Sequence, residues 1–387
     1  MIAVVFWGTT AALAWVYIGY PIVVGLFGRF RPIHLGFTEP TPSLTVAIAA
    51  HDEADSIAGR IEDVFAQEAS GATIAEVIVG SDGSRDETDA IVRGLAAREP
   101  RLRLVRLERA GQTTTQAALF ETARSEVIVL TDAETRFAPG CLARLADVFR
   151  DPVVGCATGR LEWRDEEATA TSSNEGMYWR YERWIRSLES RAGFLTAVTG
   201  ALLAVRRSAY RPVPATASMD HLLPLYVREE DGVVVYVPSA VATDRPISGA
   251  REQFRNRTRT ATRGIRANLS MATRLTPWRH PAAAVAVWSH KLLRWATPWL
   301  AAVAVLAALA LALTDRPYAI VPLLAIGGVA AGVVGDAIAR RGRRPPRPFA
   351  VARALLIVNL AFAGAWINVL AGKQIETWHR TEWETRA

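Results

Sequence analysis

The sequence predicts an α/β fold, with a doubly wound, mostly parallel sheet accompanied by transmembrane and interfacial helices. Residues 29–250 alternate short apolar runs with segments of helical spacing, which is typical of a parallel sheet covered by helices. Four other stretches contain no Asp, Glu, Lys or Arg, and each is close to the roughly 20 residues that a spanning helix needs. They are residues 2–28, 295–314, 317–335 and 354–372.

The alternation begins with the apolar run LTVAIAA at Leu44–Ala50, as expected of a strand buried on both faces. Apolar residues at helical spacing follow over residues 55–68. The same order repeats, with strands expected at residues 76–80, 102–107 and 126–131 and helices at 88–98 and 113–124. Farther on we expect an amphipathic helix over 175–189, a helix from 220 to 227, and strands at 199–205 and 233–237.

The apolar stretches predict a multi-pass protein of the plasma membrane. The first reads as a retained anchor rather than a secretory signal, since no basic residue precedes it and no clear cleavage site follows. Arg29 and Arg31 come directly after it, so the positive-inside rule places the following domain in the cytoplasm. The expected division is an anchor (1–28), a cytoplasmic domain (29–250), interfacial amphipathic helices (251–294), a region with two to three spans (295–372) and a tail (373–387). Whether residues 354–372 cross, re-enter or lie in the interface is left open.

The positive charge of the chain limits the kinds of binding partner that we expect. The chain of 387 residues has a formal net charge of +7, and arginines cluster within residues 251–266 and 340–347. Beside apolar spans, attraction to anionic membrane lipids explains such clusters better than nucleic acid binding does, and no nucleic acid partner is expected. The two cysteines, Cys141 and Cys156, suit a reducing compartment and are expected to be small core residues.

Acidic residues follow several of the predicted strands, at the sheet edge where α/β proteins bind ligands. Asp82, in the turn SDGS, suits hydrogen bonds to a ribose or base, or caps the next helix. Asp132 and Glu134 suit Mg2+ or Mn2+, or belong to an ordinary acidic loop. Asp220 is either a helix cap or a partly buried carboxylate with a raised affinity for protons.

Taken together, these motifs resemble the membrane-bound family 2 inverting glycosyltransferases, which build polysaccharides and glycolipids. The similar segments are VAIAAHDEADSI, SDGSRDETD, VLTDAETRFAPGCL, TGALLAVRR, MDHLLPLYV, the region of Gln253 to Arg257, SHKLLRW and the C-terminal ETWHRTEW. The resemblance implies a GT-A fold and a metal-dependent hexosyltransferase that uses Mg2+ or Mn2+. Gln112 stands where the family often has a lysine.

The resemblance also implies roles for single residues. Glu53 and Asp82 would contact the nucleoside of a nucleotide-sugar donor, with a UDP-sugar favoured. Asp132 would bind the metal and the diphosphate, with Glu134 as the second metal ligand. Asp220 would be the general base for inversion. Gln253, Arg255 and Arg257 would lie near the diphosphate or the acceptor.

The implied reaction is sugar transfer to a lipid-linked or saccharide acceptor at the cytoplasmic membrane face. One alternative is a processive polysaccharide synthase. Such synthases carry Q-x-x-R-W, whereas here Gln253-Phe254-Arg255-Asn256 is followed by Arg257-Thr258. The other alternative is a catalytically inactive membrane scaffold that keeps the fold, which Gln112 and Glu134 motivate.

Overall fold

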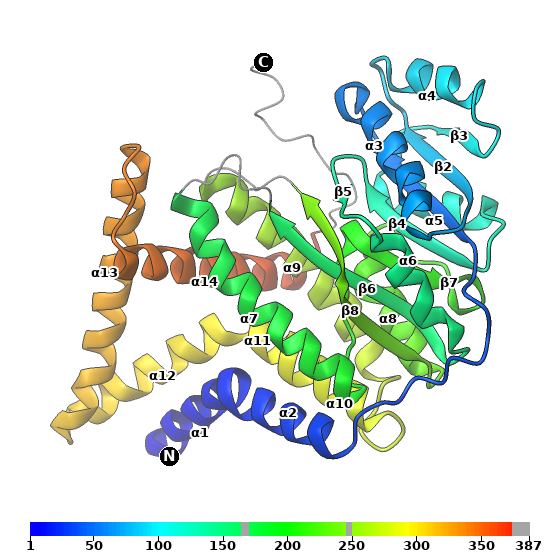
Figure 1. Cartoon of the computed structure of the whole chain (residues 1–387). Coiled ribbons are helices and arrows are strands. Elements are labelled where there is room, and N and C mark those ends of the chain that lie inside the picture. Colours follow the sequence, from blue (N-terminus) through cyan, green and yellow to red (C-terminus); the bar gives the residue numbers. More distant parts are fainter. Residues whose placement is uncertain (164–169, 245–249, 374–387) are drawn as a thin grey trace.

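The computed structural model describes residues 1–163, 170–244 and 250–373. Its centre is one eight-stranded sheet with the strand order β3-β2-β1-β4-β7-β6-β8-β5 (Figure 1). Strands β3, β2, β1 and β4 run parallel, β7 is antiparallel to both of its neighbours, and β6 and β8 are parallel. The strands are β1 (Leu44–Ala50), β2 (Ile74–Asp82), β3 (Leu102–Leu107), β4 (Val127–Asp132), β5 (Arg136–Phe137), β6 (Val154–Trp163), β7 (Leu203–Arg206) and β8 (Val233–Asp244).

This architecture confirms the predicted fold class. Strand β1 is buried along its whole length, because helices cover both faces of the sheet and its side chains contribute to an apolar core on each face. Both cysteines are buried and free, as expected for core residues. The helices of this part of the chain are α3 (Ala54–Ala66), α4 (Thr88–Ala96), α5 (Gln112–Thr122), α6 (Cys141–Asp147), α7 (Ala170–Ala192), α8 (Met219–Glu229) and α9 (Ala250–Ala272).

The remaining helices are mostly apolar and gather on the side of the molecule opposite to β3 and α4 (Figure 1). They are α1 (Ile2–Ala14), α2 (Tyr20–Phe30), α10 (Pro281–Ala286), α11 (Leu293–Trp295), α12 (Thr297–Ala312), α13 (Ile320–Arg340) and α14 (Arg347–Leu370). A π-helical turn, Trp15–Gly19, joins α1 to α2, and another, Val287–Leu292, joins α10 to α11.

Three of these segments are long and apolar enough to cross a membrane: Ile2–Phe30, Arg316–Arg340 and Arg347–Leu370. The expected span at residues 295–314 differs in form. Helix α12 has only 16 residues and meets the preceding segment, Pro281–Trp295, at a bend of 63°. Pro298 in its first turn has no N–H to continue the hydrogen bonds of α11, which accounts for a break at this point. Helix α14 packs against α9 and α7. The tail residues after 373 lie outside the described residues.

Candidate active site

A cavity of about 370 Å³ opens beyond the carboxyl end of β4 and is lined by α5, α7, α8, α9, residues 290–295 and Phe362 of α14. We call it the central cavity. It brings together four of the predicted site residues, namely Asp132, Asp220, Gln253 and Arg257. The other predicted residues are not part of its lining; these are Glu53, Asp82, Glu134 and Arg255.

Asp132 is the last residue of β4, so the strand delivers its carboxylate to the sheet edge. Gln112 Nε2 donates to Asp132 Oδ1 at 3.0 Å, so the residue that stands at the lysine position contacts the predicted metal ligand. Burial, together with the negative charges of Asp220 and Glu134, raises the pKa of Asp132 to about 6. Asp132 is hard to ionise because two other carboxylates lie near it. A cation bound there would offset the repulsion between these negative charges.

Asp220 lies in the first turn of α8, where Ser218 is the N-cap residue. The interpretation of Asp220 as the cap is therefore wrong. Its Oδ1 lies 3.1 Å from His221 Nδ1, which in turn lies 2.8 Å from Ser218 Oγ. Burial disfavours the charged form, but His221, Ser218 and Arg263 outweigh it and hold the pKa of Asp220 well below its usual range. A raised affinity for protons is thus also wrong, and Asp220 is ionised at neutral pH.

Asp82 is fully buried and holds the loop that leads into α5. The N–H groups of Ala110 and Gly111 donate to its Oδ1 at 2.7 and 3.0 Å, and Arg109 Nη1 donates to Oδ2 at 2.8 Å. Asp82 therefore does not cap the following helix. Helix α5 begins with Gln112, immediately after this loop. By holding the loop, Asp82 therefore fixes the position at which Gln112 enters the central cavity.

Glu53 lies at the N-cap position of α3, beside the loop that follows β2. Its N–H donates to Thr88 Oγ1 at 2.8 Å, and its carboxylate accepts from Ser56 Oγ. The neighbouring Asp52 accepts from the N–H of Arg85 at 2.7 Å. These bonds tie together the loops after β1 and β2, so Glu53 and Asp82 belong to one polar edge of the sheet.

Glu134 lies in the loop after β4, close enough to Asp132 to raise its pKa. In the described part of the chain, no three His, Cys, Asp or Glu side chains are placed to hold a metal ion together. Two carboxylates still suit Mg2+ or Mn2+, which typically use one or two protein carboxylates together with water and substrate phosphates.

Helix α9 carries the predicted residues Gln253, Arg255 and Arg257. Gln253 is buried and lines the cavity together with Arg257, whereas Arg255 is exposed. Sequence reasoning did not single out Arg259 and Arg263. Arg259 lines the cavity and acts electrostatically on both Asp132 and Asp220. Arg259 and Arg263 are four residues apart and therefore lie on one face of the helix. This spacing in the sequence could have identified them as site residues.

Arg263 joins the parts of the site from a buried position. Its guanidinium donates to the hydroxyl of Thr113 at the start of α5 and to the carbonyl of Ala217, just before α8. It also helps to lower the pKa of Asp220. Arg263 therefore connects the helix that begins with Gln112 to the helix that carries Asp220.

Comparisons with known proteins agree with this geometry. Residues 45–213 match the family described as Glycosyl transferase family 2. An N-acetylglucosaminyltransferase of Rhizobium meliloti (strain 1021) is 26% identical over 229 residues, which cover 53% of this chain and 51% of that protein. The succinoglycan biosynthesis protein ExoO of the same strain is 34% identical over 110 residues, which cover 28% of this chain and 30% of ExoO. The chain thus spans about half the length of the N-acetylglucosaminyltransferase.

A solved structure extends the likeness to nearly the whole chain. The mannosyltransferase PcManGT from Pyrobaculum calidifontis, in complex with GDP-Man and Mn2+, superimposes with a TM-score of 0.69. The match covers 97% of this chain and 100% of that one at 21% sequence identity, so it establishes the fold. Residues 45–213 are therefore similar to the family 2 glycosyltransferases, and the shared architecture establishes a GT-A fold.

Proposed function

We propose that the protein is an inverting, metal-dependent hexosyltransferase that moves a sugar from a nucleotide-sugar to an acceptor at the cytoplasmic face of the membrane. The observation that carries this proposal is the pair of carboxylates in the central cavity, whose pKa values are shifted in opposite directions. Titratable groups in one cavity whose pKa values are shifted apart mark a candidate catalytic site.

Asp132 and Glu134 are the proposed ligands for Mg2+ or Mn2+. When bound there, the ion would neutralise the diphosphate as it leaves the sugar. Two observations support this assignment: the like charges that raise the pKa of Asp132, and the Mn2+ bound by PcManGT, which shares the fold. Arg257 and Arg259, across the cavity on α9, would contribute positive charge to the same diphosphate.

Asp220 is the proposed general base. It is ionised throughout the physiological pH range, so its carboxylate would accept the proton of an acceptor hydroxyl as the bond to the anomeric carbon forms. A single in-line attack by that hydroxyl on the anomeric carbon would invert its configuration. Gln112, Arg263 and His221 would position the two carboxylates, since each contacts one of them or the helix that carries it.

Glu53 and Asp82 are proposed to recognise the nucleoside, Asp82 acting through the loop that it holds. A UDP-sugar is the favoured donor. Among the relatives are N-acetylglucosaminyltransferases, whereas PcManGT is a mannosyltransferase that binds GDP-Man. A donor panel must therefore include both nucleotides.

The acceptor is proposed to be lipid-linked or a saccharide, and the protein to be a multi-pass plasma membrane protein. Support comes from the three helices long and apolar enough to span a membrane. It also comes from the similarity to ExoO, a protein of succinoglycan biosynthesis. Arg29, Arg31 and the arginines of residues 340–347 would keep the catalytic domain in the cytoplasm.

The test is a panel of UDP- and GDP-sugars offered to the purified full chain, with Mn2+, with Mg2+ and with a chelator. We expect one donor to be hydrolysed or transferred only when a divalent ion is present. Asp132→Ala should abolish turnover, and Glu134→Ala should weaken it, because each removes negative charge from the metal site. Arg93→Ala, which removes an exposed arginine of α4 outside the cavity lining, should change turnover little.

The outcomes of this panel separate the alternatives. Binding of no donor under any condition would contradict the proposal and favour a catalytically inactive scaffold. Activity of Asp132→Ala in the presence of chelator would contradict the metal assignment alone. Long products from a single acceptor would favour a processive synthase over transfer of one sugar at a time.

A further inference from the structure

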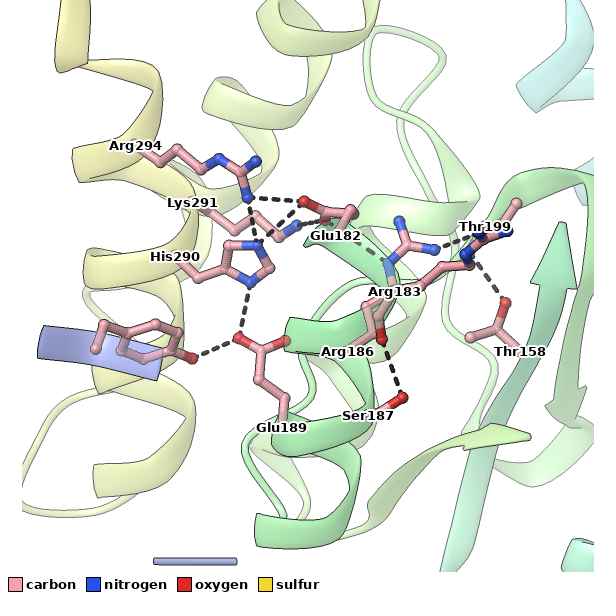
Figure 2. A network of polar contacts seen from close by, with 11 residues as sticks. Thr158, Glu182, Arg183, Arg186, Ser187, Glu189, Thr199, His290, Lys291 and Arg294 are labelled. Carbon is pink, nitrogen blue, oxygen red and sulfur yellow. Dashed lines mark hydrogen bonds and ion pairs between the residues drawn. The ribbon is translucent and has the colours of Figure 1, made fainter. Parts of the chain in front are cut away.

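A second set of charged side chains lines the central cavity on the side of the apolar helices. Glu182 of α7 faces three residues of the segment between α10 and α12 (Figure 2). Arg294 Nη1 donates to Glu182 Oε2 at 2.7 Å, Lys291 Nζ donates to Oε1 at 3.3 Å, and His290 Nε2 lies 3.5 Å from Oε2. Arg186, one turn along α7, lies 3.7 Å from Glu182 Oε1 through its Nε. We call these five residues the basic cluster.

Every member of the basic cluster is at least nine-tenths buried and lines the cavity. The π-helical turn Val287–Leu292 explains how neighbouring residues face the same way. A π-helical turn is wider than an α-helical one, and such turns are frequent at functional sites. Here it directs His290 and Lys291 together toward α7, where Arg294 joins them (Figure 2).

The second ring nitrogen of His290 also has a partner, which fixes the orientation of the ring. Its Nδ1 lies 2.7 Å from Glu189 Oε1, and the same carboxylate accepts a hydrogen bond from the hydroxyl of Tyr20 on α2. Three separate segments therefore hold the cluster rigidly. Helix packing does not require such an arrangement, because apolar side chains of similar size often stabilise an interior as well as buried ion pairs do.

We propose that Arg186, Lys291 and Arg294 bind the phosphate of a lipid-linked acceptor, with Glu182 orienting them; this rests on the function proposed above. Ammonium and guanidinium groups form strong, charge-assisted hydrogen bonds to phosphate oxygens. Lysine offers three N–H donors and arginine five, so one such side chain can contact Glu182 and a phosphate at the same time.

The place of the cluster favours a lipid over a soluble phosphate. The cavity reaches Trp295, at the bend between α11 and α12, and Phe362 of α14, which lies in a candidate membrane span. A lipid chain could follow these helices while its phosphate meets the basic cluster. The acceptor sugar would then point across the cavity toward Asp220, where the proposed base acts.

The experiment measures binding of three probes to the full chain in detergent with Mn2+ and UDP: farnesyl phosphate, farnesol and inorganic phosphate. We expect farnesyl phosphate to bind at least about ten-fold more tightly than farnesol, since a hydrogen bond between charged groups contributes roughly 1.5–3 kcal/mol. Lys291→Gln and Arg294→Gln should each weaken the binding of farnesyl phosphate about ten-fold and leave the binding of farnesol unchanged. Lys291→Arg, which keeps the charge, should retain most of it.

Arg353→Gln is the matched control. Arg353 is another buried arginine on an apolar helix, and it pairs with Asp336 at 3.0 Å outside the cavity lining. Its loss should leave the preference for farnesyl phosphate intact. Binding of UDP is measured in the same samples, so that a variant that fails to fold, or a failure of the proposed donor site, is seen separately.

Two results would overturn the proposal. One is equal affinity of the wild type for farnesyl phosphate and farnesol, or an unchanged preference in both glutamine variants while UDP still binds. The other is inorganic phosphate binding as tightly as farnesyl phosphate, which would assign the cluster to a soluble anion and remove the lipid from the proposal.

Discussion

Asp132 and Asp220 line one cavity, yet their surroundings shift their pKa values in opposite directions. Asp132 is half-buried, and this burial together with the negative charges of Asp220 and Glu134 raises its pKa to about 6. Asp220 is also half-buried, which disfavours its charge, but His221, Ser218 and Arg263 outweigh this effect and lower its pKa. A carboxylate beside positive groups stays ionised to a lower pH, whereas a carboxylate beside negative groups is protonated at a higher pH.

The raised pKa of Asp132 predicts a pH-dependent metal affinity. Below pH 6 the metal-free protein holds Asp132 protonated, and a proton must leave before the ion binds. The affinity for Mn2+ should therefore fall as the pH is lowered through about 6, while Asp220 remains ionised across this range. Isothermal titration calorimetry between pH 5 and 8 would measure the change. A Mn2+ affinity that is constant over this range would contradict the assignment of Asp132 as a ligand.

Asp220→Asn tests the proposed base. The amide has nearly the same shape and cannot take a proton, so transfer should fall by roughly 100- to 10,000-fold while donor and metal still bind. Single-turnover measurements of transfer, together with separate measurements of UDP binding, would show that transfer is lost while binding is retained. If the variant transferred at a near-normal rate, the base would have to be another group of the cavity, and Asp244 in its lining would be the next candidate.

Helix α9 organises the site because it crosses α8 and the 290–295 segment at close range. Gly264 is the residue that permits this approach. A Cβ at this position would lie 2.5 Å from Trp295 Cη2 and 2.7 Å from His221 Nε2, and both side chains are buried. Any larger residue must therefore move His221, which contacts Asp220.

Gly264→Ala should consequently reduce both stability and transfer. Overpacking of a buried contact costs roughly 1–3 kcal/mol, and displacement of His221 should lower the transfer rate beyond the effect on folding. Gly94→Ala in α4 is the matched control, because a Cβ there meets nothing within 4 Å. That substitution should stabilise the chain by roughly 0.5–1 kcal/mol through the helix preference of alanine. Thermal unfolding and transfer rates measure both, and a Gly264→Ala variant as stable and active as wild type would contradict the argument.

Across the whole molecule, the central cavity lies between the sheet and the apolar helices. Its lining comes from the soluble half through β4, α5, α8 and α9, and from the apolar half through residues 290–295 and Phe362. This shared lining supports the proposal that a nucleotide-sugar and a membrane-borne acceptor meet in the cavity.

The proposed topology can be tested with engineered cysteines. Both native cysteines are buried, and burial raises the pKa of Cys141 to about 12, so they contribute little background. Arg343→Cys, between α13 and α14, should react with a membrane-impermeant reagent only in broken cells. Asp315→Cys, between α12 and α13, should react in intact cells; both positions are exposed. The reverse pattern would overturn the orientation of the entire chain.

The sequence by itself determined the fold class and much of the first half of the sheet. The bounds of β1 and β3 agree with those expected, because period and apolar runs are local properties of neighbouring residues. Position after a strand also identified Asp132 and Asp82, since parallel strands end at a common edge. The family resemblance added the role of Asp220 as general base, and it added Gln253 and Arg257, which line the cavity with Asp132 and Asp220.

Only the tertiary structure decided how these groups behave. Asp220 was open to two interpretations in sequence. The position of Ser218 at the N-cap excludes the helix cap, and the contacts with His221 and Ser218 and the charge of Arg263 exclude a raised affinity for protons. Glu182 meets Arg294 across 112 positions of the chain, a distance over which periodicity carries no information. Ionisation and binding depend on which charges are brought together and on how much water is excluded, and folding alone creates those surroundings.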